Sequence, residues 1–282
     1  MRRPSLRRTA SMAFVAMFLG GCGPVSAVFD DPHDLPALAQ DPRVHYDAHA
    51  QGYAAQIARL LPEAMARVEA AHGRPFGGPF VIAAYLDDDA YAAANGLGAP
   101  QARGVTFLDR IAMSPAVWRE EPDWLAAYLA HELSHEHLHS HLSPLEYFRI
   151  PIWFVEGIAV VASDGGGAQR VTASEAEAEI AAGKFIETPD AASLFGNIGL
   201  RPPPPRMEGE DLRLRMHMAY RQAGLFVAFL REQDPRAFKG LMHRLLGGEA
   251  FKPAFEANYG EKLAALRARF IAGIAPKSAA RL

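Results

Sequence analysis

The sequence His131-Glu132-Leu133-Ser134-His135 places two histidines four positions apart. On a helix, residues at this spacing lie on one face, so both imidazoles can bind a single zinc ion. Glu132 then lies beside the open position of the metal, where its carboxylate can take a proton from a bound water. Catalytic zinc sites use three protein ligands, so the pattern predicts one Zn²⁺ and a third ligand elsewhere in the chain.

The residues around this stretch favour a helix that supports it. Residues 124–130 are apolar and contain good helix formers. Pro122 and Asp123 suit a first helical turn, and Ser143-Pro144 ends the run. We therefore expect the two histidines to lie in the middle of a helix of about five turns, which gives a metal site rigid support.

Two residues compete for the third ligand position. His141 follows His135 at the spacing found in metzincin peptidases, but these carry a glycine where this chain has Leu138. That glycine lets the backbone turn back towards the metal, and no glycine lies between His135 and His141. Glu156 is the one acid in the apolar run 151–159, where a carboxylate is costly to bury unless it is paired or bound to a metal. We favour Glu156, and we expect the intervening His137 and His139 to be exposed and off the zinc face.

The order HExxH, 17 residues, then Trp153-x-x-Glu156-Gly157-x-Ala159 resembles the gluzincins, the clan of zinc peptidases that includes thermolysin and the alanyl-aminopeptidase family. The resemblance implies a peptidase that acts on peptides or proteins. It also implies that His131, His135 and Glu156 bind the zinc ion and that Glu132 is the general base.

Tyr220 lies 64 positions after Glu156, at the start of an apolar helix that runs to Leu230. In aminopeptidase-like gluzincins a tyrosine at such a place donates a hydrogen bond to the oxyanion, and the resemblance implies this role for Tyr220. A tyrosine packed in the core is the alternative.

The resemblance also implies a substrate-binding edge strand that contains Gly104 and Val105 and pairs with the substrate backbone. Aminopeptidases carry a glutamate before this strand that binds the free amine of the substrate. Residues 98–103 contain no acid. The sequence therefore supports the hydrolytic centre but not aminopeptidase specificity.

The remaining pattern predicts an α+β, predominantly helical fold. A zincin-like lobe with a small mixed sheet and the zinc helix spans 49–142, and a helical lobe spans 143–282. Pro62 is expected to kink or split the first helix, and residues 164–167 (Asp-Gly-Gly-Gly) are expected to form a flexible loop. Strands are expected at 80–86, 104–107 and 110–113, and helices at 49–72, 172–182, 188–195, 218–230, 235–246, 249–258 and 261–271.

The first residues resemble a bacterial lipoprotein signal. Four arginines precede a short apolar run that ends in Leu19-Gly20-Gly21-Cys22, and Cys22 is the only cysteine. We expect residues 1–22 to be a signal peptide with a lipobox, Cys22 to carry a lipid that anchors the protein to a membrane, and residues 23–48 to be a tether. An ordinary secretory signal cut after residue 27 is the alternative. Either signal exports the protein to the cell envelope or periplasm.

Charge and composition exclude some classes of function. Without residues 1–21 the chain has 25 basic and 32 acidic residues, a net charge of −7, so we expect no nucleic-acid partner. The alternative to an enzyme is a non-catalytic envelope lipoprotein that buffers zinc with the His-rich segment 131–141. A third interpretation keeps the fold as an inactive peptidase scaffold. The sequence gives no oligomeric state.

Overall fold

A computed structural model of the 282-residue chain describes residues 31–95, 102–185 and 210–279. The expected signal segment with Cys22, and the helix expected at 188–195, lie outside the described residues. Within them, helices predominate around one five-stranded mixed sheet, so the expected α+β, predominantly helical class is confirmed. No helix in these ranges is long and apolar enough to cross a membrane.

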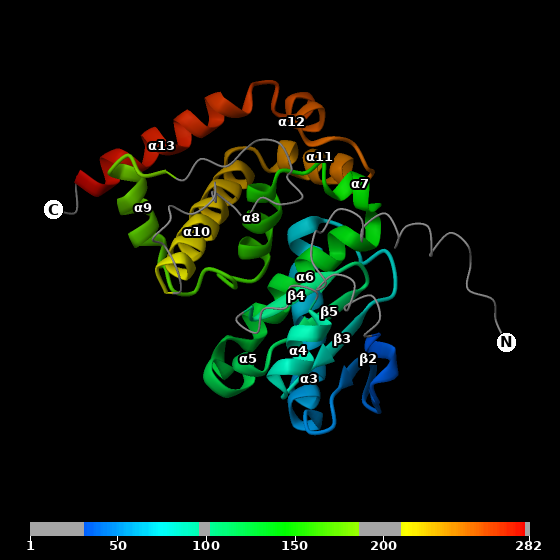
Figure 1. Cartoon of the computed structure of the whole chain (residues 1–282). Helices are drawn as coiled ribbons and strands as arrows, with labels where there is room; N and C mark the ends of the chain where they lie inside the picture. The colour runs from blue at the N-terminus through cyan, green and yellow to red at the C-terminus, as the bar shows by residue number, and fades with distance from the viewer. Residues whose placement is uncertain (1–30, 96–101, 186–209, 280–282) are drawn as a thin grey trace. The chain divides into compact units, whose positions relative to one another are not determined.

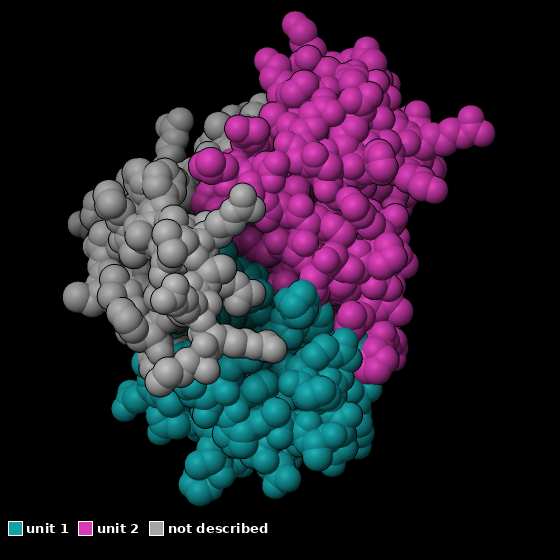
Figure 2. All heavy atoms as spheres, turned by 90° about the vertical axis from the view of Figure 1, so that its right-hand side faces the viewer, with its two compact units in different colours: residues 1–61, 79–125 teal, residues 62–78, 126–282 magenta. Residues whose placement is uncertain are grey.

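The chain forms two compact units, which Figure 2 shows in different colours. Unit 1 contains residues 1–61 and 79–125, and unit 2 contains residues 62–78 and 126–282. One division between the units falls between Leu125 and Ala126, at the start of the helix that carries His131 and His135. This helix, α6 (Leu125–His141), belongs to unit 2 except for Leu125, and Nδ1 of its His131 lies 2.9 Å from the carbonyl oxygen of Gly166 in the loop after α8 (Ile152–Ala162).

The sheet of unit 1 has the strand order β1-β2-β3-β5-β4. Strands β2, β3 and β5 are parallel, whereas β1 and β4 pair antiparallel at the two edges. Their bounds are β1 (Ala37–Leu38), β2 (Asp41–Tyr46), β3 (Val81–Ala84), β4 (Gly104–Phe107) and β5 (Arg110–Met113). The strands expected at 104–107 and 110–113 are confirmed and form the β4–β5 hairpin, in which Leu108 has a positive φ of 56°.

The segment expected to be a tether differs from that expectation in residues 32–46. It contains the short helix η1 (Pro32–Asp34) and strands β1 and β2. Val44 of β2 is fully buried and pairs with Ile82 of β3, so parallel pairing with a central strand orders a segment that has little periodicity of its own.

Helix α3 (Gln51–His72) joins β2 to β3 and passes from unit 1 into unit 2 between Leu61 and Pro62. It is one continuous helix despite Pro62, so the expected split does not occur. The hydroxyl of Tyr53 donates to the carbonyl oxygen of Ser114, 3.2 Å away, which ties the first half of α3 to the end of β5. Three short helices complete unit 1, namely α4 (Asp88–Ala94), α5 (Pro115–Glu120) and η2 (Pro122–Trp124).

Unit 2 is a helical assembly with an aromatic core. Helix α8 packs along α10 (Glu210–Gln233), and the two lie side by side in Figure 1. Trp153 and Phe154 of α8 are buried against Phe226 and Phe251. The other helices are α7 (Pro144–Tyr147), α9 (Ala173–Ala181), α11 (Pro235–Leu245), α12 (Phe251–Tyr259) and α13 (Leu263–Ala279).

Glycines allow α8 and α10 to approach closely. A Cβ atom on Gly157 would lie 2.7 Å from Cγ2 of Val227 and 2.8 Å from the carbonyl oxygen of Ala223. A Cβ atom on Gly224 would lie 2.6 Å from Cγ1 of Val160. These contacts are shorter than carbon atoms tolerate, so both positions need glycine for this packing. The pairing places the segment around Glu156 beside the segment around Tyr220.

Candidate metal centre

Helices α6 and α8 bring three potential ligands together in unit 2. The Nε2 atoms of His131 and His135 lie 3.3 and 3.6 Å from Oε2 of Glu156, and 3.2 Å from each other. The side chains are only 6, 12 and 11% exposed, respectively. All three ligand atoms lie within 4.8 Å of one another, so this group could hold a metal ion.

The donor atoms fit a cation. Oε2 of Glu156 is buried and no hydrogen bond satisfies it. A buried carboxylate oxygen without a hydrogen-bond donor lowers the stability of the folded protein by about 1–3 kcal/mol or more, unless a positive charge compensates it. Two imidazole nitrogens and one carboxylate oxygen are the ligand set of a catalytic zinc site, and other divalent transition metals also accept it.

The electrostatics of the three ligands are coupled. Burial alone would raise the pKa of Glu156, but the neighbouring His135 and His131 lower it overall. Burial alone would lower the pKa of His135, but the negative charge of Glu156 raises it overall. A bound cation would replace the proton that this pair attracts, so acid should weaken metal binding.

A backbone carbonyl orients the first ligand. Nδ1 of His131 donates to the carbonyl oxygen of Gly166, 2.9 Å away. Because Nδ1 then carries the proton, the lone pair of Nε2 points towards His135 and Glu156. The loop that supplies this carbonyl follows α8 directly, so the helix that carries Glu156 also leads to the group that orients His131.

Glu132 is buried beside the ligand group, with 7% of its surface exposed. Its charge acts on His135 of the ligand group and on two tyrosine hydroxyls, those of Tyr147 and Tyr220. The carboxylate therefore lies close enough to these groups for its charge to act on them.

Tyr220 of α10 also faces the centre. Its ring stacks over that of His131, with 6.1 Å between the centroids and an interplanar angle of 15°. Burial raises the pKa of its hydroxyl well above the ordinary value, and the charges of Glu156 and Glu132 raise it further. The phenol therefore keeps its proton at neutral pH and is a hydrogen-bond donor.

Tyr147 supplies a second phenol close enough for Glu156 and Glu132 to act on it, and the sequence patterns did not predict this. It ends α7, the short helix before α8. Burial and the charges of Glu156 and Glu132 raise the pKa of its hydroxyl. Its ring stacks on His139, with 4.1 Å between the centroids and an interplanar angle of 17°. The one available signal was a tyrosine nine residues before the expected ligand Glu156.

His137 was expected to be exposed and is instead fully buried, on the opposite side of α6. Its Nε2 donates to the carbonyl oxygen of Arg74, 2.8 Å away, so its Nδ1 accepts from Nδ1 of His72 at 3.0 Å. Nε2 of His72 then accepts from the hydroxyl of Ser134 at 2.9 Å. The end of α3 and residues 73–77 cover this face, which explains the difference.

His139 and His141 complete the His-rich segment. His139 is half-buried against Tyr147 rather than exposed, because α7 turns back over α6. Nε2 of His141, the rival third ligand, lies 2.8 Å from the carbonyl oxygen of Pro75. Among the described residues the metal-binding group therefore contains Glu156 and not His141.

Gly104 and Val105, the expected substrate-binding residues, lie in β4, which is an edge strand as expected and belongs to unit 1. Cys22 lies outside the described residues.

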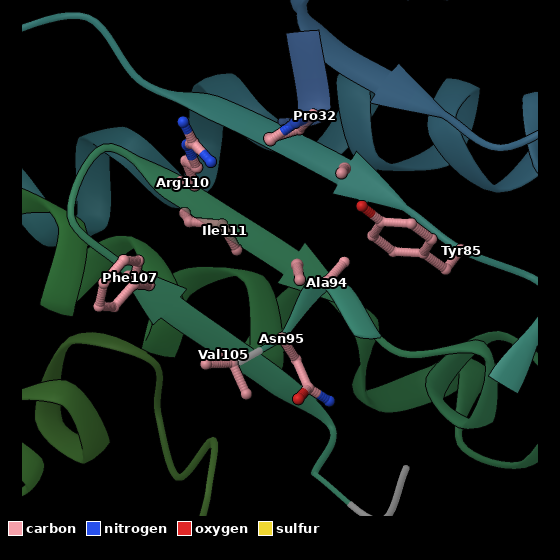
Figure 3. A pocket seen from close by; sticks show the side chains of 10 residues that line it. Pro32, Tyr85, Ala94, Asn95, Val105, Phe107, Arg110 and Ile111 are labelled. Carbon is pink, nitrogen blue, oxygen red and sulfur yellow. The ribbon is translucent and has the colours of Figure 1, made fainter. Parts of the chain in front are cut away.

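Unit 1 has a separate pocket on its sheet, shown in Figure 3. Arg110 and Tyr85 lie at opposite ends of it, and Val105, Phe107 and Ile111 supply apolar lining. Nη2 of Arg110 forms an ion pair with Asp31 at 3.2 Å. The lining contains no group of metal ligands, so the buried centre on α6 and α8 remains the candidate functional site.

Comparisons with known proteins assign no family. No protein-family model matches the chain, and neither a curated protein nor a solved structure matches it. The likeness to gluzincins is therefore carried by the HExxH spacing and by the ligand group itself.

Proposed function

We propose that the protein is a zinc-dependent peptidase that hydrolyses peptide bonds in peptides or proteins. The observation that carries this proposal is the convergence of the ligand atoms of His131, His135 and Glu156 within 4.8 Å, beside the buried Glu132. When bound, zinc would polarise the scissile carbonyl and lower the pKa of water to about 7.

Glu132 is the proton carrier in this proposal. Its carboxylate takes a proton from the attacking water and passes it to the leaving nitrogen. The residue is buried next to the ligands, so the carboxylate acts where bulk water is largely excluded and its proton transfer is directed to the substrate.

Tyr220 is the proposed oxyanion donor. A donor must keep its proton while negative charge develops on the carbonyl oxygen, and burial keeps the pKa of this hydroxyl well above the working pH. The hydroxyl of Tyr147 has the same property and faces the same carboxylates. Both phenols are available to a substrate carbonyl bound at the centre.

The zinc-buffer alternative receives less support from the His-rich segment. A buffer needs imidazoles with free nitrogen atoms near the surface. Both nitrogens of His137 lie within hydrogen-bond distance of His72 and the carbonyl of Arg74, and the residue is fully buried. His141 is likewise bonded to Pro75. Only one group of ligands is present among the described residues, as an enzyme requires.

We further propose that the protein is exported and held at a membrane of the cell envelope by a lipid on Cys22. The basic segment, the apolar run and the single cysteine support this. Replacement of Cys22 by Ser should release the protein from the membrane fraction in cell fractionation. Retention of Cys22→Ser in that fraction would exclude the lipid anchor.

The experiment that tests the activity is cleavage of a peptide library by the purified protein, with Glu132→Gln as the matched inactive form. We expect zinc-dependent cleavage that a chelator abolishes and that Glu132→Gln lacks. Equal cleavage by the two proteins would contradict the proposed mechanism.

A further inference from the structure

We infer that Arg221 is a positioning residue for the ligand His131. It holds the loop of residues 163–171 in the form that presents the Gly166 carbonyl oxygen to Nδ1 of His131. The inference rests on the proposed metal-dependent function, and it concerns residues that the HExxH pattern does not contain.

The loop lies directly against the imidazole. Gly167 has a φ of +76°, and a Cβ atom there would lie 2.6 Å from Cε1 of His131. A Cβ atom on Gly166 would lie 2.4 Å from the carbonyl oxygen of Ala127 on α6. Side chains at either position would push the loop away from His131. The glycines therefore permit contact with the ligand, whereas the sequence alone favoured a flexible loop.

Arg221 fastens the far side of this loop. Its Nε donates to the carbonyl oxygen of Val171 at 2.7 Å, and its Nη2 donates to that of Ala168 at 3.2 Å. A Cβ atom on Gly165 would lie 2.8 Å from Nη2, so the guanidinium also packs closely against the loop backbone. The planar fork of arginine can hold two carbonyls at once, which the single ammonium of lysine does less well.

The near end of the loop is tied to α8. The amide of Gly165 donates to the carbonyl oxygen of Val160 at 2.9 Å. The hydroxyl of Ser163 donates to the carbonyl oxygen of Ala159 at 2.6 Å. The loop is therefore held at both ends, by α8 on one side and by Arg221 on the other, with the Gly166 carbonyl between them.

One helix thus acts on His131 by two routes. Tyr220 stacks over the imidazole, and the adjacent Arg221 holds the loop whose Gly166 carbonyl oxygen accepts the hydrogen bond from Nδ1. If the loop relaxed, the imidazole could adopt the tautomer with the proton on Nε2, which cannot bind a metal there. The cost of restoring the binding tautomer would appear as weaker metal affinity.

The test measures zinc affinity and the His131 tautomer separately. Zinc affinity is measured by competition with a chelator for wild type, Arg221→Gln, Arg221→Lys and Arg231→Gln. Arg231 is an exposed arginine in the last turn of the same helix, so its variant is a matched control for the change of charge. The tautomer is read from long-range ¹H–¹⁵N NMR of the chelator-treated proteins, with His131→Gln to assign the signal.

We expect Arg221→Gln to weaken zinc binding at least about 10-fold, as loss of a partner behind a metal ligand does. Arg221→Lys should recover part of the loss, and Arg231→Gln should match wild type. The wild-type imidazole should carry its proton on Nδ1, and Arg221→Gln should populate the Nε2-protonated form. If Arg221→Gln does not fold, Gly167→Ala perturbs the same contact from the other side and should give the same two changes.

The inference is overturned if Arg221→Gln, or Gly167→Ala in its place, binds zinc as tightly as wild type and keeps the Nδ1 proton. The tautomer is measured without metal or substrate. A protein that binds zinc but cleaves no peptide would therefore contradict the proposed function and leave this inference to be decided by the NMR result alone.

Discussion

Oε2 of Glu156 lies 3.3 Å from Nε2 of His131, although 25 positions separate the two residues in the chain. Helix α6 presents the imidazole and α8 presents the carboxylate, and no hydrogen bond satisfies that oxygen. An ordinary polar helix face is exposed to solvent. Here a carboxylate and imidazole nitrogens lie together where solvent is largely excluded, and this arrangement is typical of a metal centre.

Replacement of Glu132 by Gln should abolish hydrolysis while zinc remains bound. The amide has nearly the same size but cannot accept the proton of the attacking water, so we expect kcat to fall by at least about 10²–10⁴. Zinc content and peptide cleavage are measured on the same preparation. Glu256→Gln is the control, because Glu256 is an exposed residue of α12, and this variant should keep full activity. Loss of zinc together with activity would instead make Glu132 a structural residue.

Loss of the Tyr220 hydroxyl should lower the rate of catalysis, whereas loss of the Tyr259 hydroxyl should lower only stability. We expect Tyr220→Phe to lower kcat by about 10²–10³ with little change in KM, because it removes a donor to the oxyanion. The same kinetics on Tyr147→Phe determine whether the second hydroxyl contributes. Tyr259→Phe is the control, since its hydroxyl donates to the carbonyl of Leu230. It should cost stability of about 1 kcal/mol and leave kcat unchanged. Full activity of Tyr220→Phe would remove Tyr220 from the mechanism.

Metal-free protein should lose stability in mild acid through the buried histidine pair. Burial lowers the pKa of His137 to about 4 and that of His72 well below its ordinary value. Both are neutral in the folded protein but protonate near pH 6.5 when unfolded. The stability that these neutral imidazoles contribute is therefore fully present above about pH 6.5. It declines as the pH falls towards 4, and for His137 the free energy of unfolding falls by on the order of 3 kcal/mol.

Urea unfolding between pH 7.5 and 4.5 checks this expectation. The free energy of unfolding should fall with pH in wild type and fall less steeply in His137→Asn, which lacks the titrating group. Parallel slopes for the two proteins would show that His137 is not held neutral by the fold.

Gly157→Ala should destabilise unit 2 by forcing α8 and α10 apart. The new methyl group would lie 2.7 Å from Val227 and 2.8 Å from the Ala223 carbonyl, and such overpacking costs about 1–3 kcal/mol. Thermal unfolding measures the change. Gly52→Ala on α3 meets nothing within 4 Å and should be neutral or slightly stabilising. A neutral result at Gly157 would contradict the close helix packing that carries Glu156 towards Tyr220.

Local patterns in the sequence predict the ligand helix and most of the elements around it. His131 and His135 share a face because of helical periodicity, and Glu156 stands out as an acid within an apolar run. The β4–β5 hairpin follows from two short apolar runs separated by Leu108 and Asp109. These signals are local, so the fold class and the metal ligands can be derived from them.

Features that depend on distant partners could not be derived in this way. His137 is buried because residues 72–77 cover it, and they lie 60 or more positions earlier in the chain. The ordered state of the glycine loop depends on Arg221, more than 50 positions later. Strand β2 is stabilised by pairing with β3 rather than by its own alternation.

We propose that His131, His135 and Glu156 together hold one zinc ion. The most direct test is the zinc content, by mass spectrometry, of purified wild type and Glu156→Ala, with Glu256→Ala as the control. We expect one zinc per chain in wild type and in the control, and a large loss in Glu156→Ala. Unchanged zinc in Glu156→Ala would contradict the account, and would shift attention to the histidines that follow His135 as the zinc ligands.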